Sequence, residues 1–158
     1  MNLFYLDRDP REAARMQCDR HVVKMILETA QMLSTAHVEL DGRQVAYKAT
    51  HKNHPSTVWV RSSAAAYRWA WLHLEALGHE YTRRYGKVHK TIREHLGTLA
   101  NYPKGITFGL DLVDPPQCMY DECRRADTVL AYQVYYNAKA DEWAAAGKPM
   151  KWYGETNE

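Results

Sequence analysis

The apolar positions between residues 19 and 37 recur at spacings of three and four, which is the period of an α-helix with one buried face. Asp19 stands where this helix begins, and the pattern ends at about His37. The apolar face consists of Val22, Val23, Met25, Ile26, Ala30, Leu33 and Ala36. The pattern therefore predicts a helix that packs against a second apolar element.

A second apolar stripe predicts one long helix over residues 57–85, with Ser56 as its N-cap and Gly86 directly after its end. Shorter helices are predicted from Asp9-Pro10-Arg11-Glu12 onward, over 88–99 and over 120–145. The stripe of the long helix consists of Val60, Ala64, Tyr67, Trp71, Leu74, Leu77 and Tyr81.

Residues 38–55 interrupt the helical rhythm with an Asp41-Gly42 turn and a polar, basic stretch, which predicts an ordered loop or a short hairpin. A second loop is expected over 103–117, where Pro115-Pro116 excludes helix. The predicted fold is all-α: a compact single-domain bundle of about five helices over residues 1–158. The side chains expected to be largely buried are Ile26, Leu33, Trp71 and Leu74.

The composition fits this picture, because 46% hydrophobic and 25% charged residues are ordinary for a globular chain. Three cysteines without a CxxC pair argue against a disulfide scaffold and a four-cysteine zinc site. The acidic residue at position 7 comes too early for a signal peptide, and no apolar run reaches membrane-spanning length. We therefore expect a cytoplasmic monomer with no membrane partner.

The first candidate for chemistry is a polar stripe on the helix that begins at Asp19. His21, Lys24 and Glu28 are spaced by three and four residues, so they stack along one face. An imidazole, an amine and a carboxylate together can supply a general acid or base and a charge stabiliser. The alternative is a solvated stripe that contains an ordinary Lys24–Glu28 pair.

The second candidate is the loop before residue 55, which gathers cationic, amide and imidazole groups in front of a helix N-terminus. Such a loop can bind phosphate, and its candidate DNA-binding residues are Lys48, His51, Lys52, Asn53 and His54. Two alternatives are a metal site formed by histidines and a histidine-rich capping loop. Since an HxxH spacing in a loop is a weak ligand signal, we expect no metal.

Two further basic, aromatic segments suit contacts with a nucleic-acid backbone and base stacking. In the first, Arg84, Lys87 and Lys90 lie at the junction of two helices, where they could equally complement a helix dipole. In the second, Lys151 and Trp152 belong to the tail, which could instead be an anchor packed on the core. The net charge of +2 is weak evidence for nucleic-acid binding.

Several of these motifs resemble a known family. Asp19-x-His21 followed by Glu28 resembles the active-site helix of phage endonuclease V-type pyrimidine-dimer DNA glycosylases. His54-Pro55-Ser56-Thr57 is similar to that family's entry to its long helix, and Trp152-Tyr153-Gly154 is similar to its C-terminus. Short phage and bacterial proteins that carry the family's name resemble residues 21–31 and 50–55 in particular.

The resemblance implies a compact helical protein without a metal, whose N-terminal amine attacks the sugar C1′ and forms a Schiff base. It matches Glu28 to the assisting carboxylate and His21 to the active-site histidine. Leu27 stands where the family has a basic residue, so Lys24 would substitute for it. The second residue is Asn2, which is bulky enough to leave the initiator Met1 in place; the sequence leaves open which of the two supplies the amine.

The function expected is that of a DNA N-glycosylase, with or without AP-lyase activity, acting on damaged or modified pyrimidines in phage or bacterial DNA. Its partner would be double-stranded DNA or a pyrimidine nucleotide, with no cofactor. One alternative is a transferase that modifies pyrimidine nucleotides or DNA bases on the same scaffold. Another is a non-enzymatic accessory protein that binds DNA or a protein. For an enzyme, we expect His21, Lys24 and Glu28 to share one cleft with the loop 47–54.

Overall fold

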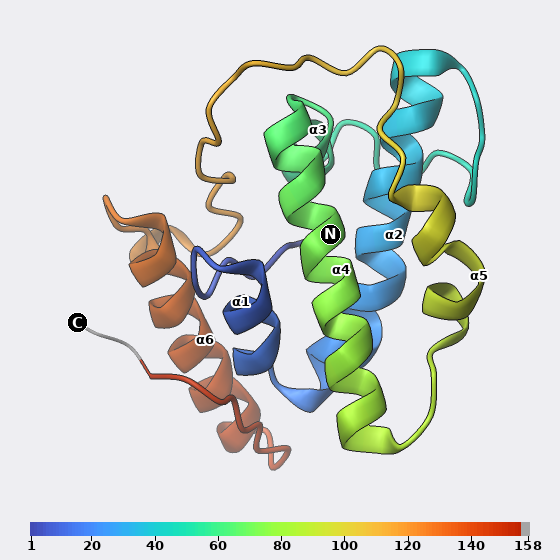
Figure 1. The fold of residues 1–158 in the computed structure, drawn as a ribbon. Helices are drawn as coiled ribbons and strands as arrows, with labels where there is room; N and C mark the ends of the chain where they lie inside the picture. The colour runs from blue at the N-terminus through green and yellow to red at the C-terminus, as the bar shows by residue number, and fades with distance from the viewer. Residues whose placement is uncertain (156–158) are drawn as a thin grey trace.

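The computed structural model describes residues 1–155, and it is all helical in that range, with no strand (Figure 1). The all-α prediction is therefore confirmed. The helices are α1 (Pro10–Met16), α2 (Asp19–Asp41), α3 (Pro55–Val60), α4 (Ala64–Tyr85), α5 (Lys90–Leu99), the 3₁₀-helix η1 (Asp121–Cys123) and α6 (Thr128–Ala145).

The two long helices, α2 and α4, pack on one another, with α1 against α4 and α5 against both (Figure 1). Their apolar stripes meet as predicted, and Ile26, Leu33 and Leu74 are completely buried. Trp71 is only half-buried, so that part of the prediction is wrong; its indole N–H donates a hydrogen bond to the carbonyl of Leu96 in α5 at 2.9 Å. No helix in the described range is long and apolar enough to span a bilayer.

The prediction of one unbroken helix over 57–85 is wrong, because the chain breaks between α3 and α4. Ser63 has an extended backbone, and its hydroxyl accepts a hydrogen bond from the amide of Ala66, so that α4 starts anew. The long loop after α5 holds the break in place, since the carbonyl of Thr107 accepts from the amide of Ala64. The cap of α3 is also His54 instead of Ser56; its Nδ1 accepts from the Ser56 amide at 3.1 Å.

Two other boundaries differ from the prediction. Helix α2 continues past His37 to Asp41, and Gly42, whose φ of 66° is left-handed, caps its C-terminus. The last long helix begins at Thr128 instead of about residue 120, because Arg124 is extended and Gln117 accepts a hydrogen bond from the amide of Arg125.

The loop after α2 contains no strand, so the alternative of a short hairpin is also wrong. Side chains of α2 hold this loop: the Ser34 hydroxyl donates to the carbonyl of Tyr47 at 2.6 Å and accepts from its amide at 2.9 Å. The loop is therefore ordered along the side of α2, where it can contribute to a site on that helix.

Residues 2–6 form a buried segment in the middle of the molecule (Figure 1). Phe4 stacks on His21 of α2, with 4.1 Å between ring centroids, and contacts Tyr136 of α6. Tyr5 packs against Trp69 of α4 at 4.9 Å. This packing against three helices fixes the position of the start of the chain.

Candidate active site

The α-amine of Met1 lies 3.2 Å from Oε1 of Glu28, which projects from the middle of α2. The side chain of Met1 is 1% exposed, whereas the residue as a whole is partly accessible, so its accessible surface belongs to the main chain. The Glu28 side chain is 15% exposed. The Met1 amine, which can act as a nucleophile, thus lies next to the Glu28 carboxylate, which can accept its proton, in a partly buried environment.

Asn2 anchors the end of the chain that carries this amine. Its side-chain N–H donates to the carbonyl of Cys118 at 3.0 Å, and its Oδ1 accepts from the amide of Phe4 at 2.9 Å. Phe4 itself has a φ of 50°, an unusual conformation for a residue with a side chain, and it turns the chain sharply. These contacts aim Met1 at α2.

Lys24, one turn before Glu28, approaches the other carboxylate oxygen, with 3.7 Å between Nζ and Oε2. Its side chain is mostly exposed, so this pair alone is weak. Oε2 of Glu28 is buried and has no hydrogen-bond partner in the described residues. Since buried carboxylate oxygens are usually hydrogen-bonded, this oxygen is an unused acceptor inside the site.

An apolar groove opens beside Glu28, with a volume of about 600 Å³. Val23 and Leu27 of α2 are exposed in it, at 38% and 39%. Across the groove, the hydroxyl of Tyr47 lies 2.9 Å from Oγ1 of Thr91. The full lining is Val23, Lys24, Leu27, Glu28, Tyr47, His89, Lys90, Thr91 and Glu94.

The loop 47–54 brings His54 into the electrostatic range of the same amine. Burial lowers the pKa of His54, and the positive charges of the N-terminal amine and of His51 lower it further. Because its Nδ1 accepts from the Ser56 amide, a neutral His54 carries its proton on Nε2. Among residues 1–155 no three His, Cys, Asp or Glu side chains gather in a way that could hold a metal ion.

His21 lies on the other side of the N-terminal segment and does not line the groove. It is 5% exposed, and its Nδ1 is 2.6 Å from the hydroxyl of Tyr136. Burial, with a smaller contribution from Lys139, lowers the pKa of His21 to about 3. The expected common cleft therefore contains Lys24 and Glu28 but not His21, which is a neutral support under Phe4.

Residues 1–94 match the family model described as pyrimidine dimer DNA glycosylase, and this range includes Met1, Glu28 and every residue of the groove. The chain belongs to this family. No curated protein and no solved structure matches the chain. The family's description is that of an enzyme acting on DNA.

Buried His21 makes the stability of this family member depend on pH. The unfolded chain protonates it near pH 6.5, whereas the folded protein resists protonation down to about pH 3. The stability it supports is thus complete above pH 6.5 and is lost as the pH falls toward 3. This dependence amounts to about 1.4 kcal/mol per pH unit. When the pH falls from 7 to 4.5, the free energy of unfolding of the unmodified protein should therefore decrease by about 2–3 kcal/mol more than that of His21→Phe, which has no imidazole to protonate.

Urea unfolding at both pH values measures this difference. The matched control is His79→Phe, which replaces an exposed histidine on α4 and should keep the pH dependence of the unmodified protein. Identical pH profiles for His21→Phe and the unmodified protein would contradict the assignment of His21 as a buried neutral side chain.

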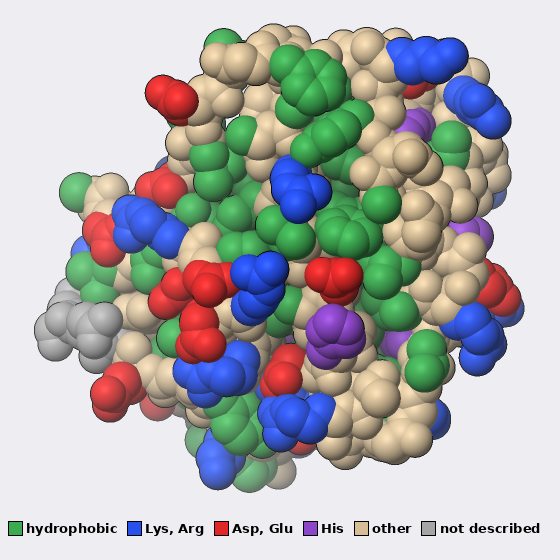
Figure 2. All heavy atoms as spheres, viewed as in Figure 1, with side chains coloured by type: hydrophobic (Ala, Val, Ile, Leu, Met, Phe, Trp, Pro, Cys, Tyr) green, Lys and Arg blue, Asp and Glu red, His purple; other side chains and the backbone are tan. Residues whose placement is uncertain are grey.

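The predicted DNA-binding residues differ in exposure. Lys48, His51, Lys52, Asn53, Lys87 and Lys90 are exposed, and Lys90 also lines the groove, whereas His54 is half-buried. The face in front of α4 carries intermingled basic and acidic side chains and no continuous basic patch (Figure 2). The exposed lysines of the loop 47–54 and of the start of α5 lie beside α2 and mark the candidate DNA surface.

Arg84, by contrast, has a side chain that is only 7% exposed. Its guanidinium binds Glu80 and Asp19, each at 3.0 Å, and donates to the carbonyls of Gln17 and Arg15. Its donors are thus used within the protein. The structure assigns Arg84 to the joint between α4 and the α1–α2 turn instead of to a DNA surface.

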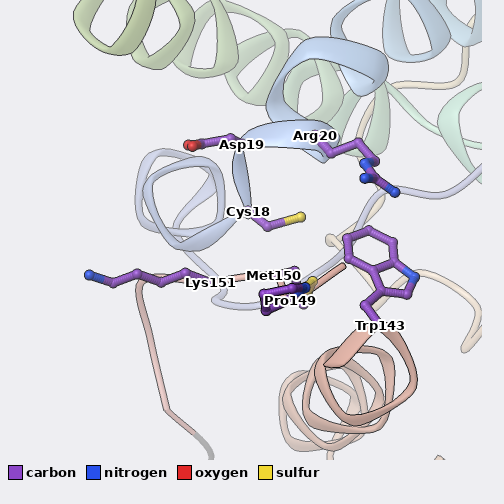
Figure 3. Close-up of a pocket in the computed structure, with 7 residues that line it drawn as sticks. All are labelled: Cys18, Asp19, Arg20, Trp143, Pro149, Met150 and Lys151. Atoms are coloured by element: carbon purple, nitrogen blue, oxygen red, sulfur yellow. The ribbon is translucent and has the colours of Figure 1, made fainter. Parts of the chain in front are cut away.

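The tail closes over the start of α2, where a smaller hollow lies (Figure 3). Trp152 is half-buried, and its ring meets Tyr136 edge-on at 5.4 Å, which is the packed anchor considered as the alternative for this segment. Lys151 is exposed at the hollow. The lining is Cys18, Asp19, Arg20, Trp143, Pro149, Met150 and Lys151 (Figure 3).

The sequence placed the loop that begins at Tyr47 beside Lys24 and Glu28, but it did not indicate that Asn2 orients the amine or that His89 and Thr91 line the groove. For Asn2 a signal exists: residues 3–6 form an unbroken apolar run, which indicates that the start of the chain is buried. For the groove no local signal exists, because its two walls are about 65 residues apart in the sequence.

Proposed function

We propose that this protein is a DNA N-glycosylase acting on damaged or modified pyrimidines, with the α-amine of Met1 as its nucleophile and Glu28 as its proton-transfer group. The single observation that carries the proposal is the 3.2 Å contact between that amine and the Glu28 carboxylate. A nucleophile within hydrogen-bond reach of a base is the usual arrangement of covalent catalysis.

In the proposed reaction, Glu28 accepts a proton from the ammonium group, and the neutral nitrogen forms a bond to C1′ of the sugar. The glycosidic bond breaks, and its electron pair leaves with the base, which takes up a proton. The C1′–O4′ bond then opens to give a Schiff base between C1′ and the Met1 nitrogen. Loss of a 2′ proton from this intermediate would eliminate the 3′ phosphate, which is the AP-lyase reaction.

The burial of Glu28 favours this proposal over a solvated Lys24–Glu28 pair. An exposed helix pair needs no third partner, yet Glu28 is 15% exposed, holds the N-terminal amine and keeps one oxygen without a hydrogen bond. Burial of a charged carboxylate costs stability unless the charge is paired, so the contact with the Met1 amine offsets the burial of Glu28.

Borohydride trapping tests the proposal. The protein is incubated with a duplex containing one abasic site, or one cyclobutane pyrimidine dimer, and sodium borohydride reduces any Schiff base to a stable adduct. We expect a covalent protein–DNA complex with both duplexes and none with undamaged DNA. Absence of an adduct on the abasic duplex would overturn the amine mechanism.

The exposed cations should account for the affinity for DNA. Lys52→Ala and Lys87→Ala are each expected to weaken binding and to reduce the slope of log K against log salt by about 0.9, because each removes one phosphate contact. Fluorescence anisotropy at several salt concentrations measures both quantities. The control is Lys104→Ala, an exposed lysine beyond the far end of α2. An equal effect of Lys104→Ala would contradict the proposed surface.

A further inference from the structure

We propose that His54 and His89 are positioning residues of the candidate active site, and that protonation of either ring breaks a contact that holds the site, so that activity is lost in mildly acidic solution. Each histidine is the N-cap of a helix that borders the site: His54 caps α3 and His89 caps α5. The structural part of this inference stands on the two caps, whereas its effect on activity rests on the proposed function.

The two caps use the imidazole ring in the same way. Nδ1 of His54 accepts a hydrogen bond from the amide of Ser56, and Nδ1 of His89 accepts one from the amide of Thr91, each at 3.1 Å. A ring nitrogen can accept a hydrogen bond only while it carries no proton. Protonation of Nδ1 therefore removes the cap and places a positive charge at a helix N-terminus, where the helix dipole repels it.

The other side-chain caps in the described part of the chain are of the usual kind. Asp9 caps α1 and Ser63 caps α4, and neither residue lines the groove. Carboxylate and hydroxyl caps do not gain a proton between pH 5 and 7, whereas histidine is the side chain that ordinarily titrates in that range. Caps that can fail in mild acid are thus found at the two helices beside the site.

The cap of α3 is linked to the residue that orients the amine. The hydroxyl of Ser56 lies 3.5 Å from Sγ of Cys118, and the carbonyl of Cys118 accepts the hydrogen bond from the side chain of Asn2 at 3.0 Å. Ser56 is buried, so the first turn of α3 cannot shift without disturbing these contacts. Loss of the His54 cap should therefore weaken the anchor that aims Met1 at Glu28.

The cap of α5 holds one wall of the groove. Thr91 donates its amide to the cap, and its hydroxyl oxygen is the atom that lies 2.9 Å from the hydroxyl of Tyr47. Thr91 is buried, and its contact with Tyr47 joins the start of α5 to the loop 47–54 across from Glu28. Loss of the His89 cap should therefore disturb this wall of the groove and the loop together.

The surroundings of His54 favour its neutral form at pH 7. Burial lowers the pKa of His54, and the positive charges of the Met1 amine and of His51 lower it further, while Glu28 acts in the opposite direction. Because the pKa lies below its ordinary value near 6.5, the cap is complete at neutral pH and fails as the pH falls below 6.5.

His89 has the same tendency for a simpler reason. Burial lowers its pKa, and its ring packs edge-on against Tyr81 of α4, with 5.0 Å between ring centroids. The ionisable side chains that line the groove with His89 carry both signs of charge, and they are Lys24, Glu28, Tyr47, Lys90 and Glu94. This cap, too, is complete at neutral pH and fails in mild acid.

Nuclear magnetic resonance can observe the two caps without DNA. In ¹⁵N-labelled protein, the amide protons of Ser56 and Thr91 should move to higher field between pH 7.5 and 5, as amides do when they lose an acceptor, and in step with the titration of the two rings. The amide of Phe4, which donates to Oδ1 of Asn2, should follow His54. Ser56 and Thr91 amide signals that stay constant while the rings titrate would overturn the proposal.

The activity test replaces each ring with an acceptor that does not titrate. Asparagine is among the best N-caps, so His54→Asn and His89→Asn keep a capping oxygen at every pH. Each protein's rate of trapping on an abasic duplex at pH 5 is divided by its own rate at pH 7.5, with cyanoborohydride as the reductant. We expect this ratio to be at least about 5-fold higher in the double variant than in the unmodified protein, because no cap is left to protonate.

The control for this ratio is His79→Asn, which replaces an exposed histidine of α4 outside the groove and should keep the ratio of the unmodified protein. His54→Ala and His89→Ala remove the acceptor altogether, so each should trap severalfold more slowly than its asparagine counterpart at pH 7.5. This rescue by asparagine distinguishes the cap from the ring itself.

Two results of the activity test would overturn the proposal. One is an equal ratio in the unmodified protein and in the double asparagine variant. The other is equal trapping by the asparagine and alanine variants at pH 7.5, because the capping bond would then not matter to the site. If the unmodified protein forms no adduct at any pH, the proposed function fails, and the amide titration still decides whether the two caps respond to acid.

Discussion

Glutamine in place of Glu28 is expected to slow base release by about 10²–10⁴-fold, the usual contribution of a general acid or base. The amide has nearly the same size but can neither take a proton from the Met1 amine nor stabilise positive charge that develops on the sugar. The affinity for DNA should remain nearly unchanged, because it depends on cations and counterion release. Single-turnover base release and anisotropy titration measure the two quantities separately.

The matched control for this variant is Glu39→Gln, an exposed carboxylate eleven residues further along α2, which should behave as the unmodified protein. If Glu28 were only part of a solvated pair, Glu28→Gln would change the free energy of unfolding by a few tenths of a kcal/mol and leave turnover intact. Turnover of lesion DNA at the normal rate by Glu28→Gln would thus exclude the assigned role.

Addition of one glycine before Met1 is expected to abolish the borohydride-trapped adduct. The extension replaces the amine beside Glu28 with an uncharged amide and moves the new terminus by about 3.8 Å, the distance between consecutive Cα atoms. Since the exposed cations are unchanged, DNA binding should persist. Trapping on an abasic duplex, together with anisotropy, measures both effects.

A removable extension supplies the control for this experiment. A protease site that leaves Met1 as the first residue after cleavage should restore the adduct in the same preparation, which shows that the protein was folded throughout. An adduct of normal yield before cleavage would mean that another amine reacts, and the ε-amine of Lys24 would be the nearest alternative on α2.

The helices that pack through a continuous stripe could be predicted from the sequence, but the break before α4 could not. Val60 and Ala64 are four residues apart, so the apolar rhythm continues across the break without a gap. What separates α3 from α4 is the Ser63 cap and a loop that arrives from residue 107, more than 40 residues away. A contact between residues this far apart does not alter the spacing of apolar residues, so the hydrophobic pattern of the sequence cannot reveal it.

The candidate site shows the same limit. The spacing of His21, Lys24 and Glu28 places them on one stripe of α2, and two of them meet as expected. Spacing fixes the direction of a side chain on its helix but not what covers it. The N-terminal segment covers His21 with the ring of Phe4 and brings its own amine to Glu28. His21 is therefore a buried structural residue, whereas Glu28 belongs to the candidate active site.

The central claim is that the Met1 amine is the reacting group, and the attachment point of the trapped DNA tests it most directly. The borohydride-reduced complex is digested with nuclease and protease, and tandem mass spectrometry locates the residual sugar on the peptides. The account predicts the added mass on the α-nitrogen of the peptide that begins with Met1. An adduct on a lysine ε-nitrogen, with an unmodified N-terminal peptide, would contradict it.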